Sequence, residues 1–373
     1  LAINNDVVGH LVQFVDRERY LFFAGVSWCW RIAWGNRPTF TRAVTFDTSI
    51  SQLQCSFDCG LRRGASLCNA VAEIGKLELL HCARANGCPW SKDTTCWGAA
   101  TNGRLDVLEW VRENGCPWDE RTCSAAAEKG HLDVLEYARE NGCPWSGHTC
   151  GGAARGGHLH VLRWARANGC EWSSHICRLA AEGGHLDVLH WARENGCLWG
   201  EDTCAAAASR GHVRLLQWCW TNGCPWNETT CNAAAHFGHL DVLHYARANG
   251  CPWSAATCMI AARAGQLSVL VFAKENGCPW DHLTCANAAA GGHFEILHWA
   301  RWNGCPWNEL TCGSAAEEGR LEILQWVREN GCPWDASTCS AAAGGGHLHI
   351  LEWARANGCP WDEKTCSRAA GGG

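Results

Sequence analysis

Apolar and polar positions along most of the chain follow one pattern that repeats every 27 residues. In the copy spanning residues 122–148, TCSAAAEKGHLDVLEYARENGCPWSGH, an Ala-rich stretch opens after Thr122 and ends at Gly130. Thr is a good N-cap, Ala favours helix, and Gly ends helices, so this stretch predicts a short first helix. A helical stripe of apolar residues follows and closes at Gly142, with Pro144 just beyond, which predicts a second helix. Its stripe consists of Leu132, Val134, Leu135 and Ala138, with Tyr137 beside them.

The pentapeptide Asn-Gly-Cys-Pro-Trp marks each copy of the pattern. Glu171 and Leu198 replace its Pro in two copies. Its Cys recurs 28 residues apart once and 27 apart nine times, at positions 88, 116, 143, 170, 197, 224, 251, 278, 305, 332 and 359. A second Cys follows in every copy, at C-x6-C spacing in all but the first. The sequence therefore predicts an all-α fold, an α-solenoid of stacked helical hairpins over residues 65–373, with about eleven repeats and the last one truncated.

A single repeat is too small to fold alone. Ordering 27 residues costs roughly 40 kcal/mol of conformational entropy, whereas burying ~1,000 Å² of apolar surface returns about 25 kcal/mol. Stacking supplies the missing burial. We expect two aromatic rows along the stack, one from the second helices and one from the Trp of each pentapeptide. With neighbouring helices ~8–10 Å apart, the stack would present a surface on the order of 100 Å long, and we expect it to bind a protein partner.

Composition and charge narrow the class of partner. The chain is 47% hydrophobic and 18% charged, with a formal net charge of −6 and no dense run of Lys or Arg, so nucleic acid is not an expected partner. The longest strongly apolar stretch, residues 20–30, falls short of the ~20 residues that span a bilayer, so no membrane partner is expected. The chain begins with Leu1 and stops within a repeat, which suggests that both ends are cut.

The repeat resembles the ankyrin repeat. Thr122 matches its helix-opening Thr, Ala126-Ala127 its paired Ala, residues 130–135 (GHLDVL) its Gly-His-Leu-Glu-Val-Val, and Gly142-Cys143 its Gly-Ala. This period is six residues short of the 33 described for ankyrin, and the missing residues fall where that family builds its β-hairpin fingers. The resemblance implies an ankyrin-like stack without fingers that binds protein through its helices and short loops, and not an enzyme.

Residues 6–31 differ from the repeats and resemble an F-box. The Val and Leu positions, Phe14 and the closing Val-Ser-x-x-Trp-Arg match that motif, although its opening Leu-Pro is missing. The resemblance implies docking onto a ubiquitin-ligase adaptor subunit through Val7, Val8, Leu11, Phe14 and Val26. The alternative is a helical N-terminal cap that shields the first repeat. Either interpretation divides the chain into residues 1–46, a linker at 47–64, and the repeats at 65–373.

Twenty-eight Cys residues raise the possibility of disulfides or zinc. Zinc ligands are usually paired at C-x2-4-C, which C-x6-C is not. Equivalent Cys of successive repeats should lie farther apart than the ~7 Å limit for a disulfide, which leaves only a bridge within each C-x6-C loop. We interpret the Cys as small core residues, with no metal or cofactor, and hence expect a cytoplasmic or nuclear protein; a disulfide- or metal-stabilised structural rod is the alternative.

The His after the repeat Gly recurs in seven copies, for example His131, whereas catalysis needs one asymmetric constellation in a cleft. We therefore expect this His to hydrogen-bond the turn. Positions that vary between copies are candidates for recognition. They fall in two places, the two residues before each repeat Gly and the loop after each CPW, and two aromatic residues stand where most copies are polar or Ala. The predicted partner-binding residues are Glu128, Lys129, Arg155, Arg210, His236, Phe237, Arg263, Trp302, Glu317 and Glu318.

Overall fold

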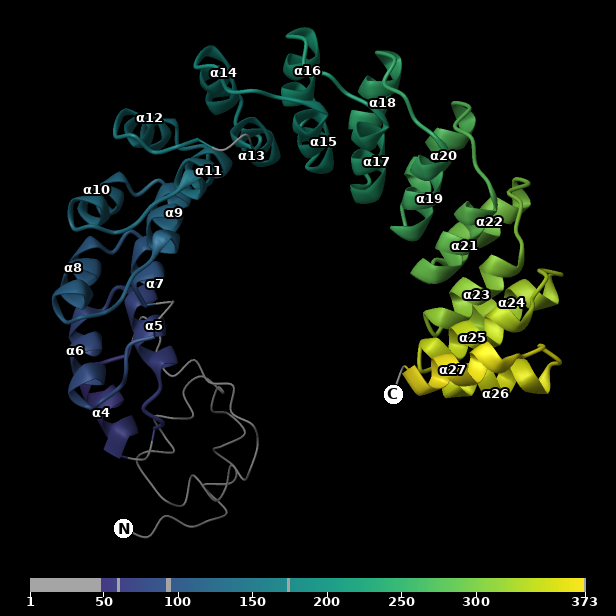
Figure 1. Cartoon of the computed structure of the whole chain (residues 1–373), viewed down its shortest axis with the longest axis horizontal. Coiled ribbons are helices and arrows are strands. Elements are labelled where there is room, and N and C mark those ends of the chain that lie inside the picture. The colour runs from purple at the N-terminus through teal and green to yellow at the C-terminus, as the bar shows by residue number, and fades with distance from the viewer. Residues whose placement is uncertain (1–47, 59–60, 92–94, 173–174, 372–373) are drawn as a thin grey trace, which may run out of the picture. The chain divides into compact units, whose positions relative to one another are not determined.

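The computed structural model describes residues 48–58, 61–91, 95–172 and 175–371. Within these ranges every regular element is an α-helix, and the helices alternate between a first and a second helix of each repeat (Figure 1). The all-α solenoid expected from the sequence is therefore confirmed. The F-box-like segment, with Val7, Val8, Leu11, Phe14 and Val26, lies outside the described residues.

The first helices are α5 (Ala65–Ile74), α7 (Thr95–Thr101), α9 (Glu120–Lys129), α11 (Gly147–Gly156), α13 (Ile176–Gly183), α15 (Glu201–Ser209), α17 (Glu228–Phe237), α19 (Ala255–Arg263), α21 (His282–Gly291), α23 (Glu309–Glu317), α25 (Ala336–Gly344) and α27 (Glu363–Gly371). The second helices are α6 (Leu77–Ala85), α8 (Leu105–Glu113), α10 (Leu132–Glu140), α12 (Leu159–Ala167), α14 (Leu186–Glu194), α16 (Val213–Thr221), α18 (Leu240–Ala248), α20 (Leu267–Glu275), α22 (Phe294–Trp302), α24 (Leu321–Glu329) and α26 (Leu348–Ala356).

The repeats fall into two compact units, an N-terminal unit that ends at Ile176 and a C-terminal unit that begins at Cys177. Within each unit the first helices pack side by side in one layer and the second helices form another layer (Figure 1). Small residues make the first layer dense, since Ala126 and Ala127 of α9 are completely buried. Helices with small side chains at the contact can approach closely.

The segment 47–64 contains a helix within the stretch expected to be a linker. Helix α4 (Ile50–Asp58) packs against α6 and buries Leu53 and Phe57. The Asn86 side chain at the end of α6 donates a hydrogen bond to Gln54 Oε1 at 2.9 Å. This helix covers apolar surface on the first described hairpin, as an end of a repeat stack requires.

The first helix begins three residues earlier than the sequence suggested. Asp119 is its N-cap, and its carboxylate accepts a hydrogen bond from Arg121 N at 3.0 Å. The prediction of Thr122 as N-cap is therefore wrong, because Thr122 already lies within the first turn and is buried. An Asp at the N-cap also carries a negative charge that the helix N-terminus favours.

Each hairpin has a continuous apolar core. Cys123, Val134, Leu135, Ala138 and Cys143 are all completely buried in the repeat chosen above. The backbone of Cys143 donates to Ala138 O at 2.8 Å after the Gly142 turn, so the loop that follows the second helix is fixed to the helix end. The prediction that the periodic Cys are small core residues is confirmed for all that the structure describes except Cys366, which is exposed.

The repeat His joins one repeat to the one before it. Nε2 of His212, His239 and His293 lies 3.1–3.2 Å from the carbonyl oxygens of Glu182, Ser209 and Arg263, respectively. The His158 ring lies against Gly130 of the preceding repeat, where an added Cβ would come within 2.5 Å of Nδ1. The expectation that this His bonds the turn is confirmed, and the turn belongs to the neighbouring repeat.

Candidate interaction surface

Nine of the ten predicted partner-binding residues lie at the C-terminal ends of first helices. We call this surface the variable ridge. It comprises Glu128, Lys129, Arg155, Arg210, His236, Phe237, Arg263, Glu317 and Glu318, of which the first three belong to the N-terminal unit and the others to the C-terminal unit. All are exposed except the half-buried Glu128. The ridge therefore presents side chains that differ from repeat to repeat on helices that are fixed by a buried core.

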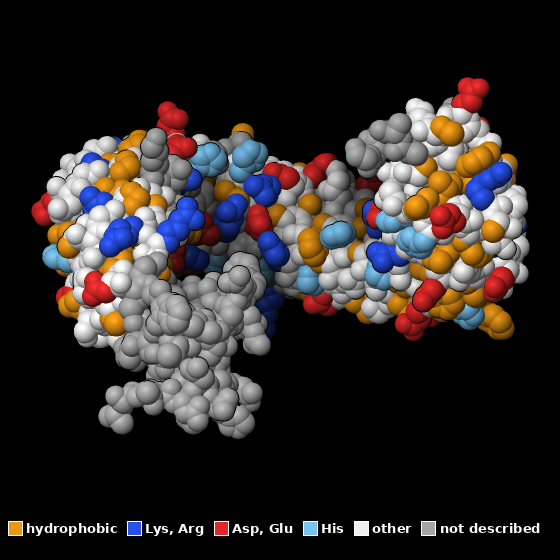
Figure 2. Space-filling view, turned by 90° about the horizontal axis from the view of Figure 1, so that it is seen from below, with side chains coloured by type: hydrophobic (Ala, Val, Ile, Leu, Met, Phe, Trp, Pro, Cys, Tyr) orange, Lys and Arg blue, Asp and Glu red, His pale blue; other side chains and the backbone are white. Residues whose placement is uncertain are grey.

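Ion pairs link parts of the ridge in the C-terminal unit. Arg210 lies 3.3 Å from Glu182, and Arg263 of α19 lies 3.0 Å from Glu318. The second pair passes over α21, whose C-terminal residue is Gly291, so no side chain of that helix end stands between them. Exposed ion pairs of this kind add at most about 1 kcal/mol to the free energy of unfolding. Because so little is lost when they break, their charged side chains can pair with a partner instead. In Figure 2, basic and acidic side chains are interspersed on the visible face of the repeats.

An aromatic cluster is the most apolar part of the ridge. Phe237 is 51% exposed, and its ring contacts those of His236 at 4.6 Å and His239 at 6.4 Å between centroids. Since large exposed aromatic side chains are favoured as binding anchors, Phe237 is the strongest single candidate on the ridge. Trp302 is 84% exposed but is the last residue of the second helix α22, so it does not belong to the ridge.

A second feature was missed from the sequence, because constant positions were assigned to packing alone. The guanidinium of Arg139 lies 4.1 Å from the centroid of Trp145 and donates to Cys143 O at 2.7 Å. Trp145 in turn contacts Trp164 of the next second helix edge to face, with centroids 5.8 Å apart. The two expected aromatic rows are therefore interlocked. A basic residue six positions before the Trp recurs in every other copy except the one that has Trp220 there, and this spacing was the available signal.

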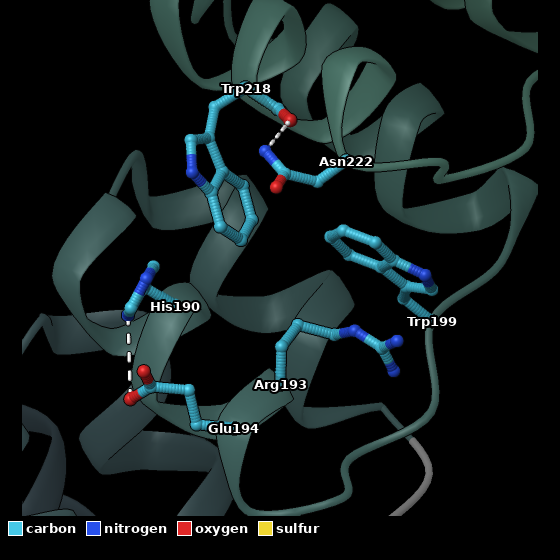
Figure 3. A pocket seen from close by; sticks show the side chains of 6 residues that line it. All are labelled: His190, Arg193, Glu194, Trp199, Trp218 and Asn222. Atoms are coloured by element: carbon cyan, nitrogen blue, oxygen red, sulfur yellow. Dashed lines mark hydrogen bonds and ion pairs between the residues drawn. The ribbon is translucent and has the colours of Figure 1, made fainter.

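The interlocked rows leave a pocket of about 280 Å³ in the C-terminal unit (Figure 3). Arg193 lies 4.2 Å from the centroid of Trp199, which contacts Trp218 at 5.6 Å. On the same helix as Arg193, His190 Nδ1 is 3.5 Å from a carboxylate oxygen of Glu194. Asn222 completes the lining and donates to Trp218 O at 2.8 Å. The pocket offers aromatic faces, one guanidinium and one carboxylate, which suit a side chain with both apolar and polar parts.

The thiols pair inside each repeat, between the first helix and the loop after the second helix. Cys150 and Cys170 are hydrogen-bonded neighbours, and this bond together with burial raises the pKa of Cys150. Burial raises the pKa of Cys68 to about 12. The expectation that only a C-x6-C bridge fits the geometry is wrong, because each thiol's neighbour lies 20 residues away in its own hairpin. The described cysteines are free thiols in the structure.

One thiol outside the periodic series was also missed. Cys219 of α16 joins Cys204 and Cys224, so three thiols converge in this repeat. The first described repeat also has a third thiol, Cys82, but this one contacts Gln54 and Asn86. The signal for Cys219 in the sequence was a Cys at a helix position that is Ala or Val in the other repeats.

Comparisons with known proteins identify no family for this chain. No protein-family model matches it, and no curated protein matches its sequence. None of the helices in the described part of the chain combines the length and apolar character needed to cross a bilayer. Among solved structures, the crystal structure of the human ASB11 ankyrin repeat domain is similar at 18% sequence identity, over 43% of this chain and 85% of that one, with a TM-score of 0.35.

Proposed function

We propose that this chain is a protein-binding repeat scaffold that recognises its partner through the variable ridge. The supporting observation is the contrast within each repeat, where the constant Ala, Leu and periodic Cys residues are buried in the core while varied side chains stand exposed at the ends of rigid first helices. A long, rigid surface of this kind binds other macromolecules without paying a large ordering cost. Recognition by such a surface needs no catalytic group, cofactor or metal.

Interaction mass spectrometry on the full-length protein would identify the partner, and ridge variants would then locate its contact. The triple variant Arg210→Ala, Phe237→Ala, Arg263→Ala should weaken binding at least about tenfold, because the truncation of anchor residues typically costs ~2 kcal/mol or more. Glu275→Ala, an exposed change at the end of α20 and away from the ridge, is the matched control. Equal affinity of the triple variant and the wild type would refute the proposal.

We also propose that residues 6–31 recruit a ubiquitin ligase by docking on its adaptor subunit. The support is the F-box resemblance of this segment and its position before a long recognition surface. Under this proposal the partner held by the ridge is the protein to be modified. The adaptor would contact the apolar set Val7, Val8, Leu11, Phe14 and Val26.

Mutation separates docking from the capping alternative. Val8→Asp with Leu11→Asp should abolish adaptor pull-down and leave the thermal stability of the repeats nearly unchanged. A capping segment would instead lose stability, because buried apolar groups would be replaced by charges. Loss of stability in the double variant, or no adaptor binding by the intact protein, would leave only the cap.

The reduced state of the thiols, and with it a cytoplasmic or nuclear location, is part of the same proposal. Thiol titration under native and denaturing conditions distinguishes it from a structural rod that is held by disulfides. Full thiol recovery only after denaturation is expected, because every described periodic thiol except the exposed Cys366 is buried. Loss of most thiols in a non-reduced sample would favour the rod.

A further inference from the structure

Three buried thiols converge in one repeat of the C-terminal unit. Cys204 lies on the first helix α15, Cys219 on the second helix α16, and Cys224 in the loop that follows. Their Sγ atoms all lie within 4.8 Å of one another, and none of the three residues is more than 1% exposed. Within the described ranges of the chain, this is the one group of three or more His, Cys, Asp or Glu side chains whose ligand atoms converge in this way. We call it the thiol trio.

Two departures from the repeat pattern coincide in this hairpin. Cys219 occupies the helix position that elsewhere holds Ala83, Val111, Ala138, Ala165, Ala192, Ala246, Ala273, Ala300, Val327 or Ala354. The next residue, Trp220, replaces a basic residue that is present in each of those copies. Trp220 stacks on Trp226, with centroids 4.0 Å apart and an interplanar angle of 12°. This repeat has therefore gained a third sulfur and lost its own guanidinium.

Both departures favour a cation in the core. The repeat that contains Cys123 and Cys143 serves for comparison, and we call it the sister repeat. There, Arg139 donates a hydrogen bond to the carbonyl of Cys143 and interacts electrostatically with Cys123, so a positive charge already accompanies the thiol pair. The trio lacks that charge from its own repeat, while Arg193 of the preceding repeat still interacts with Cys224. Thiolates brought together there would be stabilised by a bound metal ion, and Arg193 would offset part of the remaining negative charge.

We propose that the thiol trio binds one copper(I) ion through three sulfur ligands. Thiolates are soft ligands that select copper(I) and zinc. Zinc is almost always four-coordinate, whereas the trio offers three sulfurs and no His or carboxylate ligand, in a site that is closed to solvent. Three sulfurs around an ion at a metal–sulfur distance of ~2.3 Å lie about 4.0 Å apart, within the observed separation. Three S–H bonds give up their protons to solvent, and three metal–sulfur bonds form.

Copper(I) titration of the reduced full chain against a chromophoric copper(I) chelator, without oxygen, tests the proposal. We expect one equivalent of copper(I) to bind more tightly than any further equivalents. X-ray absorption spectroscopy should show three sulfur ligands around this copper ion. Cys219→Ala restores the residue that most other repeats have at this position. It should lower the copper(I) affinity of the tight site more than about 100-fold, since even the loss of an outer-shell partner lowers metal affinity 10–100-fold. Cys219→Ser removes the soft ligand but nearly keeps the volume of the side chain, and it should lower the copper(I) affinity by a similar factor.

Matched variants of the sister repeat control for binding by ordinary thiol pairs. Cys123→Ala should leave the tight equivalent unchanged. Ala138→Cys with Arg139→Trp copies both departures and should create a second tight equivalent. A tight equivalent that survives in both Cys219 variants, or two sulfurs around copper, would overturn the proposal. So would tighter binding of zinc than of copper(I) to the trio.

Discussion

Gly130 and Gly142 allow the contact between repeats to be measured separately from backbone strain. Both have left-handed backbone conformations, with φ of 80° and 78°. A Cβ at Gly142 meets no atom within 4 Å, whereas one at Gly130 would lie 2.5 Å from Nδ1 of the His158 ring. Gly142→Ala therefore introduces only backbone strain, and Gly130→Ala also displaces the ring of the next repeat.

The expected free-energy costs follow from these two contributions. A left-handed Ala costs ~1–2 kcal/mol, and the lower entropy of the unfolded chain returns about 0.4–1 kcal/mol, so Gly142→Ala should destabilise by roughly 0.5–1 kcal/mol. Overpacking adds ~1–3 kcal/mol, which brings Gly130→Ala to about 1.5–4 kcal/mol.

Hydrogen exchange of the amides in α9 to α12 is the suitable assay, because it reports the opening free energy of these repeats rather than of the whole chain. His158→Ala should remove the additional cost, so that Gly130→Ala in that background costs about as much as Gly142→Ala. Equal costs of Gly130→Ala and Gly142→Ala in the wild-type background would show that the ring contact contributes nothing.

Three further outcomes are expected from urea unfolding. Asp119→Ala should cost about 1 kcal/mol through loss of the helix cap, while an effect within error would mean that the cap is replaced by solvent. Leu135→Ala should cost ~2–5 kcal/mol because the side chain is completely buried, and a cost below 1 kcal/mol would contradict that burial. Burial raises the pKa of Cys68 from 9.0 to about 12. The contribution of the neutral Cys68 thiol to the free energy of unfolding should therefore be fully present below pH 9 and lost as pH rises towards 12. A Cys68→Ala variant with the same pH profile would refute this assignment.

The repeat pattern predicted the hairpins because helix periodicity and glycine stops are local properties of the sequence. The N-cap was misplaced because Thr122 and Asp119 are both good caps, and only the structure shows which carboxylate or hydroxyl reaches a backbone N–H. The thiol pairing was missed for a different reason. Cys123 and Cys143 meet through the fold of the hairpin, whereas Cys116 and Cys123 are merely close in sequence. The packing of the two helices in a hairpin determines which Cys residues are neighbours, and the sequence period does not reveal it.

The predicted ridge residues came from comparing copies of the repeat with one another, which separates buried from exposed positions. The same comparison concealed the stack of Arg139 on Trp145, because the Trp145 position never varies and such a position looks like core even when it is half exposed. Trp302 lies elsewhere on the repeat. Its variability was real, but the structure places it on a second helix and away from the ridge.

The contact of each repeat His with the turn before it also bears on how the chain could have lengthened. The contact joins residues about one period apart, and the thiol pair and the Arg–Trp stack close within a repeat. An in-frame duplication of 27 residues would therefore bring a complete set of partners to both new junctions, wherever in the repeat the duplication began. Unequal recombination between gene copies could thus change the reach of the protein in single steps without passing through an unfolded ancestor.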